Sequence, residues 1–463
     1  MTTPEPPDDP APDIPAPDIA PHASETTAPP AAAQPPPSGA ATGARPAAAT
    51  PPGVGDAAGA AASAAGAGVG DSASAGSAVP STVAGGRGTL LPAAIARRVS
   101  PARGPEVAAR VGIALGAAIL VCFATGLLSH WIQHPPQWFA WPAYPVWLYR
   151  VTQGTHVVSG VVAIPLLLVK LWSVYPRLFA RPLLGDPVRA LERVSIAVLV
   201  GSVIFQLVTG LFNTAQNYPW RFFFTTTHYA MAYIAVGALT VHLAVKLPVI
   251  RTALRRPADS ENAAGHGISR RTLLGTAAVA ALVAGLSTAG QTVPYLRRIA
   301  VLAPRSGQGP QGVPINRTAL EAGVEQRATA ADYTLTVAVG DRRRTFTRAE
   351  LAGLPQHDAD LPITCVEGWS ATARWSGVRL RDLLAAVGEY RGGGVRFTSL
   401  EDSGIYRVSV LPRPHVIAAD TLVALRIGGA DLNLDHGYPC RLIAPNRPGV
   451  LQTKWLSRIE ELP

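Results

Sequence analysis

Residues 361–369 read LPITCVEGW and are followed at 374–378 by RWSGV and an apolar stretch that runs to Leu384. Cys365 within this stretch is one of only three cysteines among 463 residues, so we propose no disulfide framework. A single thiol in an extended segment that ends in a Gly-Trp turn suits a soft-metal ligand or a nucleophile. The alternative is a buried cysteine that packs as a small hydrophobic residue.

Composition changes sharply along the chain. Residues 1–95 are dominated by Ala, Pro, Gly, Ser and Thr, and the first aromatic residue of the chain is Phe123. Such a segment cannot bury enough apolar area to offset the entropy lost on ordering, so we expect a disordered cytoplasmic tail. It lacks a basic start followed by an apolar core, so we do not expect it to be a secretory signal peptide.

Five apolar stretches follow the tail, and they cover 109–131, 151–174, 193–213, 226–250 and about 272–293. The first four approach or exceed the roughly 20 residues that a helix needs to cross a bilayer. The fifth is less hydrophobic and rich in small residues. We therefore expect a four-helix transmembrane domain at 96–250, a basic cytoplasmic linker at 251–271, and a fifth transmembrane helix at 272–293.

Positive charge predicts the orientation of these helices. The net charge is +10, and the Lys and Arg residues cluster beside apolar stretches, which favours membrane topology over nucleic-acid binding. Basic segments alternate with two loops, 131–150 and 214–225, whose only Lys or Arg residues are Arg150 and Arg221. By the positive-inside rule the N-terminus is cytoplasmic, and the chain after about residue 295 lies outside a bacterial inner membrane.

An arginine pair directly precedes the fifth stretch. Residues 269–274, SRRTLL, resemble a twin-arginine export signal, with Leu273 where Phe is commoner. Arginine pairs beside a membrane helix also act as plain topology determinants. Both interpretations place the C-terminal domain outside.

Two histidines occur at matching depth in different apolar stretches. His156 lies near the outer end of the second stretch and His228 near the outer end of the fourth. Polar residues inside a bilayer are costly and usually functional, and two such histidines can clamp one heme iron axially. The alternative is that they only form hydrogen bonds between helices. His130 and His134 are expected in the outer interfacial loop.

His242 follows His228 by 14 residues, which is about four turns or roughly 21 Å along one helix face. This spacing resembles the bacterial di-heme b-type cytochromes with a four-helix core. The second ligand of an inner heme is missing, because the matching position in the second stretch is about Lys170. We therefore expect one heme b, held by His156 and His228. His242 could ligate a second heme with an unidentified partner, line a quinone pocket, or pack as a core histidine.

Residues 296–463 have a soluble character. Strand patterning is clear at 333–339, and Thr347 and Glu350 have the spacing of a capping box that starts a short helix. Residues 379–387 predict another helix. We expect an α/β fold that is large enough for its own core.

Several segments of this region resemble the sulfite-oxidase superfamily of molybdenum enzymes, in which one cysteine thiolate coordinates the metal of a pterin cofactor. The segment around Cys365 resembles the ligand loop. The other segments follow in the family's order, at 314–318 (PINRT), 395–399 (VRFTS), 436–445 (HGYPCRLIAP) and 449–456 (GVLQTKWL). The run after the cysteine, 366–370 (VEGWS), is closer to periplasmic methionine-sulfoxide reductase catalytic subunits than to sulfite oxidases.

The resemblance implies roles for particular residues. Cys365 is the implied molybdenum ligand and catalytic centre. Contacts to the pterin or its phosphate are implied for Asn316, Ser399, His436, Arg441, Gly449, Val450, Leu451 and Lys454. A phosphate needs cationic side chains, and Arg441, Arg447 and Lys454 can supply them. Candidates for the substrate pocket are Tyr406, Arg407, Arg413 and His415.

We therefore expect a membrane-bound, molybdopterin-dependent oxidoreductase with its own heme b domain. It transfers an oxygen atom to or from a small extracytoplasmic substrate, which is sulfoxide-, N-oxide- or sulfite-like, and either direction of electron flow fits. The expected partners are the quinone pool, this substrate and the lipid bilayer, with no nucleic acid. The alternative is a membrane scaffold or sensor whose external domain binds a ligand without turnover.

Overall fold

The computed structural model describes residues 104–178, 187–255, 269–303 and 309–463, without the side chains of 176–178, 188 and 189. The predicted tail at 1–95 and residues 256–268 of the predicted linker lie outside the described residues.

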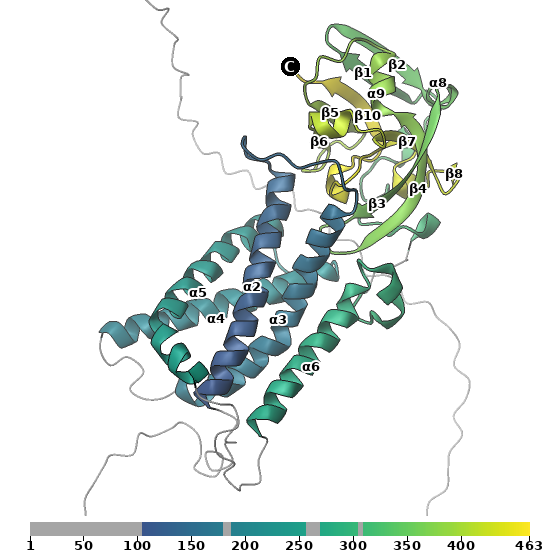
Figure 1. Cartoon of the computed structure of the whole chain (residues 1–463). Helices are drawn as coiled ribbons and strands as arrows, with labels where there is room; N and C mark the ends of the chain where they lie inside the picture. Colours follow the sequence, from purple (N-terminus) through teal and green to yellow (C-terminus); the bar gives the residue numbers. More distant parts are fainter. Residues whose placement is uncertain (1–103, 179–186, 256–268, 304–308) are drawn as a thin grey trace, which may run out of the picture. The chain divides into compact units, whose positions relative to one another are not determined.

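Five long helices form the first part of the described chain (Figure 1). They are α2 (Pro105–Gln133), α3 (Leu148–Leu178), α4 (Pro187–Thr214), α5 (Phe224–Arg255) and α6 (Arg270–Ala289). All five are long and apolar enough to cross a membrane, as the apolar stretches predict. Helix α3 packs against α2 and α6, and α4 packs against α5. Their shared core contains Val107 and Leu115 of α2, Leu166 of α3 and Val203 of α4.

Helix α2 is longer than the apolar stretch that predicted it. It continues to Gln133, so His130 lies in its last turn and not in a loop, as the sequence suggested. The helix ends there because Pro135 and Pro136 cannot continue it, and His134 is the C-cap residue. His130 therefore faces neighbouring helices instead of interfacial solvent.

The C-terminal part contains two five-stranded sheets. The first has the order β2 (Arg342–Thr347), β1 (Thr334–Val339), β10 (Leu456–Glu461), β5 (Val395–Ser399) and β6 (Val408–Leu411). The second has the order β3 (Gln356–Thr364), β4 (Ser370–Arg379), β7 (Leu422–Ile427) and β8 (Ala430–Asp431), and β9 (Arg441–Ile443) also pairs with β7. Among these strand pairs only β1 and β10 are parallel. Because antiparallel neighbours need no crossover helix, the helices here are shorter than the predicted α/β fold implied.

Four short α-helices occur among the described residues of the C-terminal part, one before β1 and three between strands. They are α7 (Glu325–Ala328), α8 (Arg348–Gly353), α9 (Leu380–Ala385) and α10 (Arg413–Val416). The predicted capping box is confirmed, because Thr347 Oγ1 accepts from Glu350 N at 3.2 Å and Glu350 Oε2 accepts from Thr347 N at 2.8 Å. The predicted strand at 333–339 is β1, and the helix expected at 379–387 is the shorter α9.

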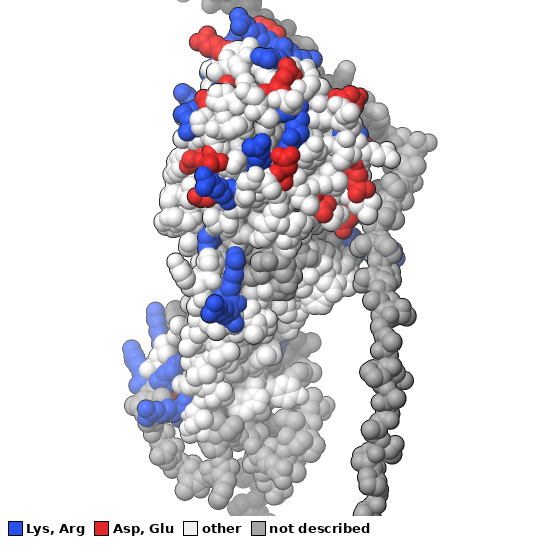
Figure 2. All heavy atoms as spheres, turned by 90° about the vertical axis from the view of Figure 1, so that its right-hand side faces the viewer, with Lys and Arg blue, Asp and Glu red and all other residues white. Residues whose placement is uncertain are grey.

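Cys440 and Cys365 lie in two different hydrophobic cores of the C-terminal part. Cys440 packs with Phe346, Phe397 and other side chains of the first sheet. Cys365 belongs to the second core, beside Trp375 of β4. Figure 2 shows mixed acidic and basic side chains on the sheet-containing part, whereas the helical part is mostly uncharged with scattered Lys and Arg.

Candidate active site

A tight turn presents the thiol of Cys365. The residue follows β3 directly, its N–H donates to Trp369 O at 2.9 Å, and Gly368 N donates to Cys365 O at 3.1 Å. Gly368 has φ +101°, a backbone conformation that favours glycine. The Cys365 side chain is 1% exposed, and Asn316 Nδ2 lies 2.9 Å from its Sγ. The fold thus brings together Asn316 and Cys365, which are 49 residues apart in sequence.

The segment 449–451 lies beside this turn. Pro448 forms a parallel bridge with Thr364, the residue before Cys365. A Cβ atom at Gly449 would lie 3.3 Å from the Thr364 carbonyl oxygen, so the two backbones pack closely. Gly449, Val450 and Leu451 form the short helix η5 (Gly449–Leu451). The structure therefore places this predicted cofactor segment next to the predicted metal ligand.

Buried cations gather near the first residues of β9. Arg441 donates to the carbonyl oxygens of His436 at 2.9 Å and Gln452 at 3.2 Å. Lys454 Nζ donates to the carbonyl oxygens of Arg317 at 2.5 Å and Asp435 at 2.9 Å. His436 Nε2 lies 2.7 Å from Pro310 O and donates to it. Carbonyl oxygens hold these side chains in place without neutralising their charge.

The charge of this cluster is incompletely compensated. Burial lowers the pKa of Arg441 to about 9, and burial together with Arg441 lowers the pKa of Lys454 to about 7. Within the described residues, Nε of Arg441 has no hydrogen-bond partner. Buried cations of this kind are stabilised by an anion, so the cluster fits the phosphate of a pterin cofactor.

Ser399 is buried at the end of β5, where its Oγ accepts from Glu401 N at 3.2 Å. Its hydroxyl hydrogen can still donate to a cofactor. Glu401 forms an ion pair with Arg317 at 2.7 Å. Burial raises the pKa of Glu401, and the Arg317 guanidinium partly offsets this rise.

The candidates for a substrate pocket separate into two groups. Tyr406 is half-buried, and its pKa is raised by burial and by the neighbouring Cys365 thiolate. His415 is 0% exposed, neither of its ring nitrogens has a partner among the described residues, and burial lowers its pKa to about 3. Arg407 and Arg413 are exposed, and Arg413 lies against Gly392. Tyr406 and the neutral His415 are therefore better placed for a buried site than the two arginines.

Sequence analysis missed Asn446, which attaches the α2–α3 connection to the C-terminal part. Asn446 Oδ1 accepts from Tyr149 N at 2.7 Å, its Nδ2 donates to Pro142 O at 2.7 Å, and its carbonyl accepts from Trp141 Nε1 at 2.8 Å. These contacts join residues about 300 positions apart, and no local pattern marks them.

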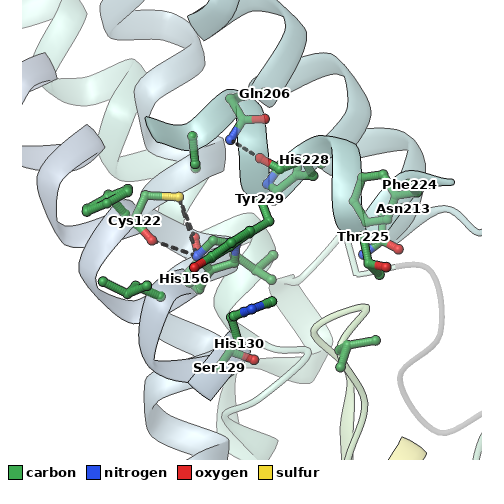
Figure 3. A pocket seen from close by; sticks show the side chains of 18 of the residues that line it. Cys122, Ser129, His130, His156, Gln206, Asn213, Phe224, Thr225, His228 and Tyr229 are labelled. Atoms are coloured by element: carbon green, nitrogen blue, oxygen red, sulfur yellow. Dashed lines mark hydrogen bonds between the residues drawn. The ribbon is translucent and has the colours of Figure 1, made fainter. Parts of the chain in front are cut away.

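A second site lies among the helices, in a cavity of about 360 Å³ that Figure 3 shows from close by. His156 and His228 face each other across it, with ring centroids 6.4 Å apart. His156 Nδ1 lies 2.8 Å from Cys122 O, and His228 Nδ1 lies 3.1 Å from Thr209 Oγ1. The Nδ1 atom of each ring is therefore engaged, which leaves Nε2 as the nitrogen available to a ligand.

Other histidines lie around or away from this cavity. His130 also lines it and stacks on Tyr229, with centroids 3.7 Å apart. His242 does not line it and lies near charged side chains, among them Lys170 and Lys246. The structure thus brings His156 and His228 together and leaves His242 apart.

Comparison with known proteins finds a family match in the C-terminal part of the chain. Residues 321–462 match the model of the oxidoreductase molybdopterin binding domain. This molybdopterin domain is similar to sulfite oxidase from Gallus gallus, 32% identical over 152 residues, which cover 27% of this chain and 33% of that protein. Sulfite oxidase from Arabidopsis thaliana is 28% identical over 159 residues, which cover 27% of this chain and 40% of that protein.

Two further proteins similar to part of the chain come from the sequence and structure comparisons. NADPH nitrate reductase from Neurospora crassa is 35% identical over 100 residues, 20% of this chain and 10% of that protein. Among solved structures, the sulfane dehydrogenase SoxCD from Paracoccus pantotrophus aligns with 23% identity and a TM-score of 0.26. The alignment covers 28% of this chain and 38% of the SoxCD chain. The chain spans no more than two-fifths of any of these four proteins. The match therefore concerns a molybdopterin-binding oxidoreductase domain of the sulfite-oxidase type.

The buried ammonium of Lys454 predicts that cofactor binding depends on pH. Because its pKa is about 7 and a bound phosphate favours the charged form, binding above that pH takes up a proton. We expect the affinity of the apoprotein for a pterin phosphate to fall as the pH rises from about 7 to about 9, by up to about tenfold per unit. Below about pH 7 the Lys454 ammonium is already protonated, so it adds no pH dependence to this affinity. Calorimetric titration measures the slope.

A matched variant makes this prediction specific. Lys454→Arg keeps a positive charge at all these pH values, so its affinity profile should be flatter than that of the native protein. An equally steep fall in the arginine variant would show that another group takes up the proton.

Proposed function

We propose that the chain is a membrane-bound, molybdopterin-dependent oxidoreductase that transfers an oxygen atom to or from a small extracytoplasmic substrate. The observation that carries this proposal is the buried Cys365 thiol beside Asn316, in the same domain as the incompletely compensated Arg441 and Lys454. A thiolate for the metal and cations for the phosphate are the two kinds of group that such a cofactor needs.

Several residues of the domain would have distinct roles in this mechanism. Cys365 would hold the metal, and the Asn316 N–H directed at its sulfur would stabilise the thiolate. Arg441, Lys454 and His436 would hold the phosphate end. The bound cofactor supplies the two-electron oxygen-atom chemistry, while the protein orients it and limits access. Tyr406 can donate a hydrogen bond to a substrate oxygen near Cys365, and the neutral His415 can donate or accept a hydrogen bond through its ring nitrogens.

A heme b between His156 and His228 is the second part of the proposal. Two imidazole nitrogens bound to one metal at about 2 Å separate the ring centroids by about 6 Å, close to the observed 6.4 Å. The hydrogen bond from His156 Nδ1 to the Cys122 carbonyl is the support that metal-ligating histidines commonly have. Gly126 and Gly210 lie against the two rings, so no side chain blocks the approach of a flat ligand.

A single heme is favoured over two. Lys170 occupies the position where an inner ligand would be needed, and its Nζ donates to Ala108 O at 2.5 Å. A Cβ at Gly112 would lie 2.8 Å from this ammonium. A positively charged group in that place disfavours a second iron, so we assign His242 to packing or to a quinone site.

The remaining expectations complete the proposed function. The five apolar helices and the basic segments support a multi-pass protein of the bacterial inner membrane, with the N-terminus inside and the molybdopterin domain outside. Electrons from quinol would reach the heme and then the molybdenum, with a sulfoxide or N-oxide as acceptor. The twin arginines at 270 and 271, which open α6, would support export of the folded domain.

Metal analysis and turnover of the purified protein test the proposal. We expect one molybdenum per chain, together with reduction of a sulfoxide by reduced methyl viologen or oxidation of sulfite by ferricyanide. Sulfoxide reduction alone would assign the direction of electron flow. Protein that is folded and isolated from a molybdenum-replete host but lacks the metal would contradict the proposal and favour a non-catalytic sensor.

A further inference from the structure

We propose that Gln153 is a positioning residue that joins the Cys365 loop to the helix of His156 and thereby sets the rate of electron transfer between the two cofactors. This inference rests on the proposed function, because it requires molybdenum at Cys365 and heme at His156. It concerns a residue that has no ligand role of its own.

Gln153 connects the two sites directly. It lies on α3, one turn before His156, and is 3% exposed. Its Nε2 donates to the carbonyl oxygen of Val366 at 2.8 Å, and Val366 is the residue after Cys365. One hydrogen-bonded connection between Cys365 and His156 therefore consists of one peptide unit, one hydrogen bond and three residues of helix.

The amide of Gln153 is held in one orientation. Tyr149 is fully buried, and its hydroxyl lies 3.5 Å from Gln153 Oε1 and 3.2 Å from Ser129 Oγ. Because Oε1 faces the Tyr149 hydroxyl, Nε2 points to the Val366 carbonyl. A buried amide whose two ends have different partners fixes the distance between the groups that it joins.

Two neighbouring contacts strengthen the same connection between the Cys365 loop and the helical part. Gly368, two residues beyond Val366, packs so closely that a Cβ there would lie 2.6 Å from Val157 Cγ2. Glu367, between them, accepts hydrogen bonds from Gln216 Nε2 and from Trp369 Nε1. Val366 also lines the cavity that contains His156 and His228. Three consecutive residues after Cys365 thus contact the helical part.

Electron transfer across this connection has a simple balance. With both cofactors bound, each passage would take one electron from a heme held by His156 and His228 and deliver it to a metal held by Cys365. Two passages with two protons convert one sulfoxide into a sulfide and water, and one quinol is oxidised to quinone. The rate of electron tunnelling falls steeply with distance. A contact that holds the Cys365 loop at a fixed distance from the helix of His156 would therefore also fix the rate of electron transfer.

The test is a stopped-flow measurement on the full-length protein. The heme is first reduced with dithionite, excess reductant is removed, and the decay of the reduced α band is followed after mixing with a sulfoxide. In Gln153→Met, which keeps the length of the side chain but removes its donor, we expect heme reoxidation to slow by about tenfold or more. The reduced heme spectrum, its midpoint potential, the molybdenum content and viologen-driven turnover should stay as in the native protein.

Two further variants sharpen the result. Thr152→Val is the matched control, because its hydroxyl lies on the same turn and donates only to Tyr149 O at 3.1 Å. It should reoxidise at the native rate. Gln153→Leu also removes the donor and should slow reoxidation as the methionine variant does, which keeps the test decisive if one variant folds poorly.

Different results distinguish this inference from the proposed function. A native reoxidation rate in both Gln153 variants, or a slowing explained by a changed midpoint potential, would overturn the role of Gln153. Absence of an α band or of molybdenum in the native protein would instead overturn the proposed function.

Discussion

Replacing Cys365 by serine is expected to reduce viologen-driven turnover by more than the roughly 10- to 100-fold that loss of an outer-shell partner of a metal typically costs. In the proposed function Cys365 is the protein ligand of the molybdenum, and a hydroxyl is a much poorer donor to a soft metal. The reduced heme α band should be unchanged, because His156 and His228 lie on helices that the substitution does not alter. Turnover assays, metal analysis and a reduced-minus-oxidised spectrum measure the three quantities.

Cys440→Ser is the matched control for this variant. Cys440 is also fully buried in the molybdopterin domain, but its sulfur faces Tyr333, with 3.2 Å between Sγ and the hydroxyl oxygen. Burial raises the pKa of the Cys440 thiol to about 12, and the proposed function gives this thiol no role as a ligand. Equal loss of activity in both serine variants would mean that general damage to the domain, and not removal of a ligand, explains the result.

Replacing His156 by alanine is expected to abolish quinol-driven turnover while viologen-driven turnover remains. In the proposed function the substitution would remove one of the two histidines that hold the heme, and with it the fixed position of the heme. The b-type α band should be lost or strongly reduced, whereas the molybdenum content should not change. Spectra and the two turnover assays on the same preparation give all the values.

His242→Ala separates one heme from two. His242 lies away from the cavity, so this variant should keep the native heme content, as measured by the pyridine hemochrome spectrum. A halving of heme content would instead identify His242 as a ligand of a second heme. An α band that persists unchanged in His156→Ala would contradict the assignment of the cavity itself.

The elements predicted correctly are those that a short stretch of sequence determines. The five helices follow from apolar stretches of about twenty residues, since the bilayer criterion depends on composition and length. The helix after Thr347 follows from a capping box, whose two hydrogen bonds span three residues. The sequence predicted matching depth for His156 and His228, and the structure places their ring centroids 6.4 Å apart.

What the sequence did not reveal depends on contacts between distant segments. The bond from Gln153 to Val366 spans 213 residues, and Asn446 contacts Pro142 across 304 residues. Neither residue belongs to a motif, and polar residues of their kind are common on exposed surfaces as well. Helix α2 continues to Gln133, beyond residue 131 where the predicted apolar stretch ends, because buried Ile132 packs against neighbouring residues and keeps the last turn helical.

The hydrogen bonds between Asn446 and the segment from Trp141 to Tyr149 have a kinetic consequence. The side chain and carbonyl of Asn446 fasten Trp141, Pro142 and Tyr149, so the helices and the molybdopterin domain are tethered at a fixed point. A tethered partner acts at an effective concentration set by geometry, whereas a separate electron donor must be encountered by diffusion. At a fixed ratio of quinol to lipid, turnover per molecule should therefore be independent of how densely the protein populates the membrane.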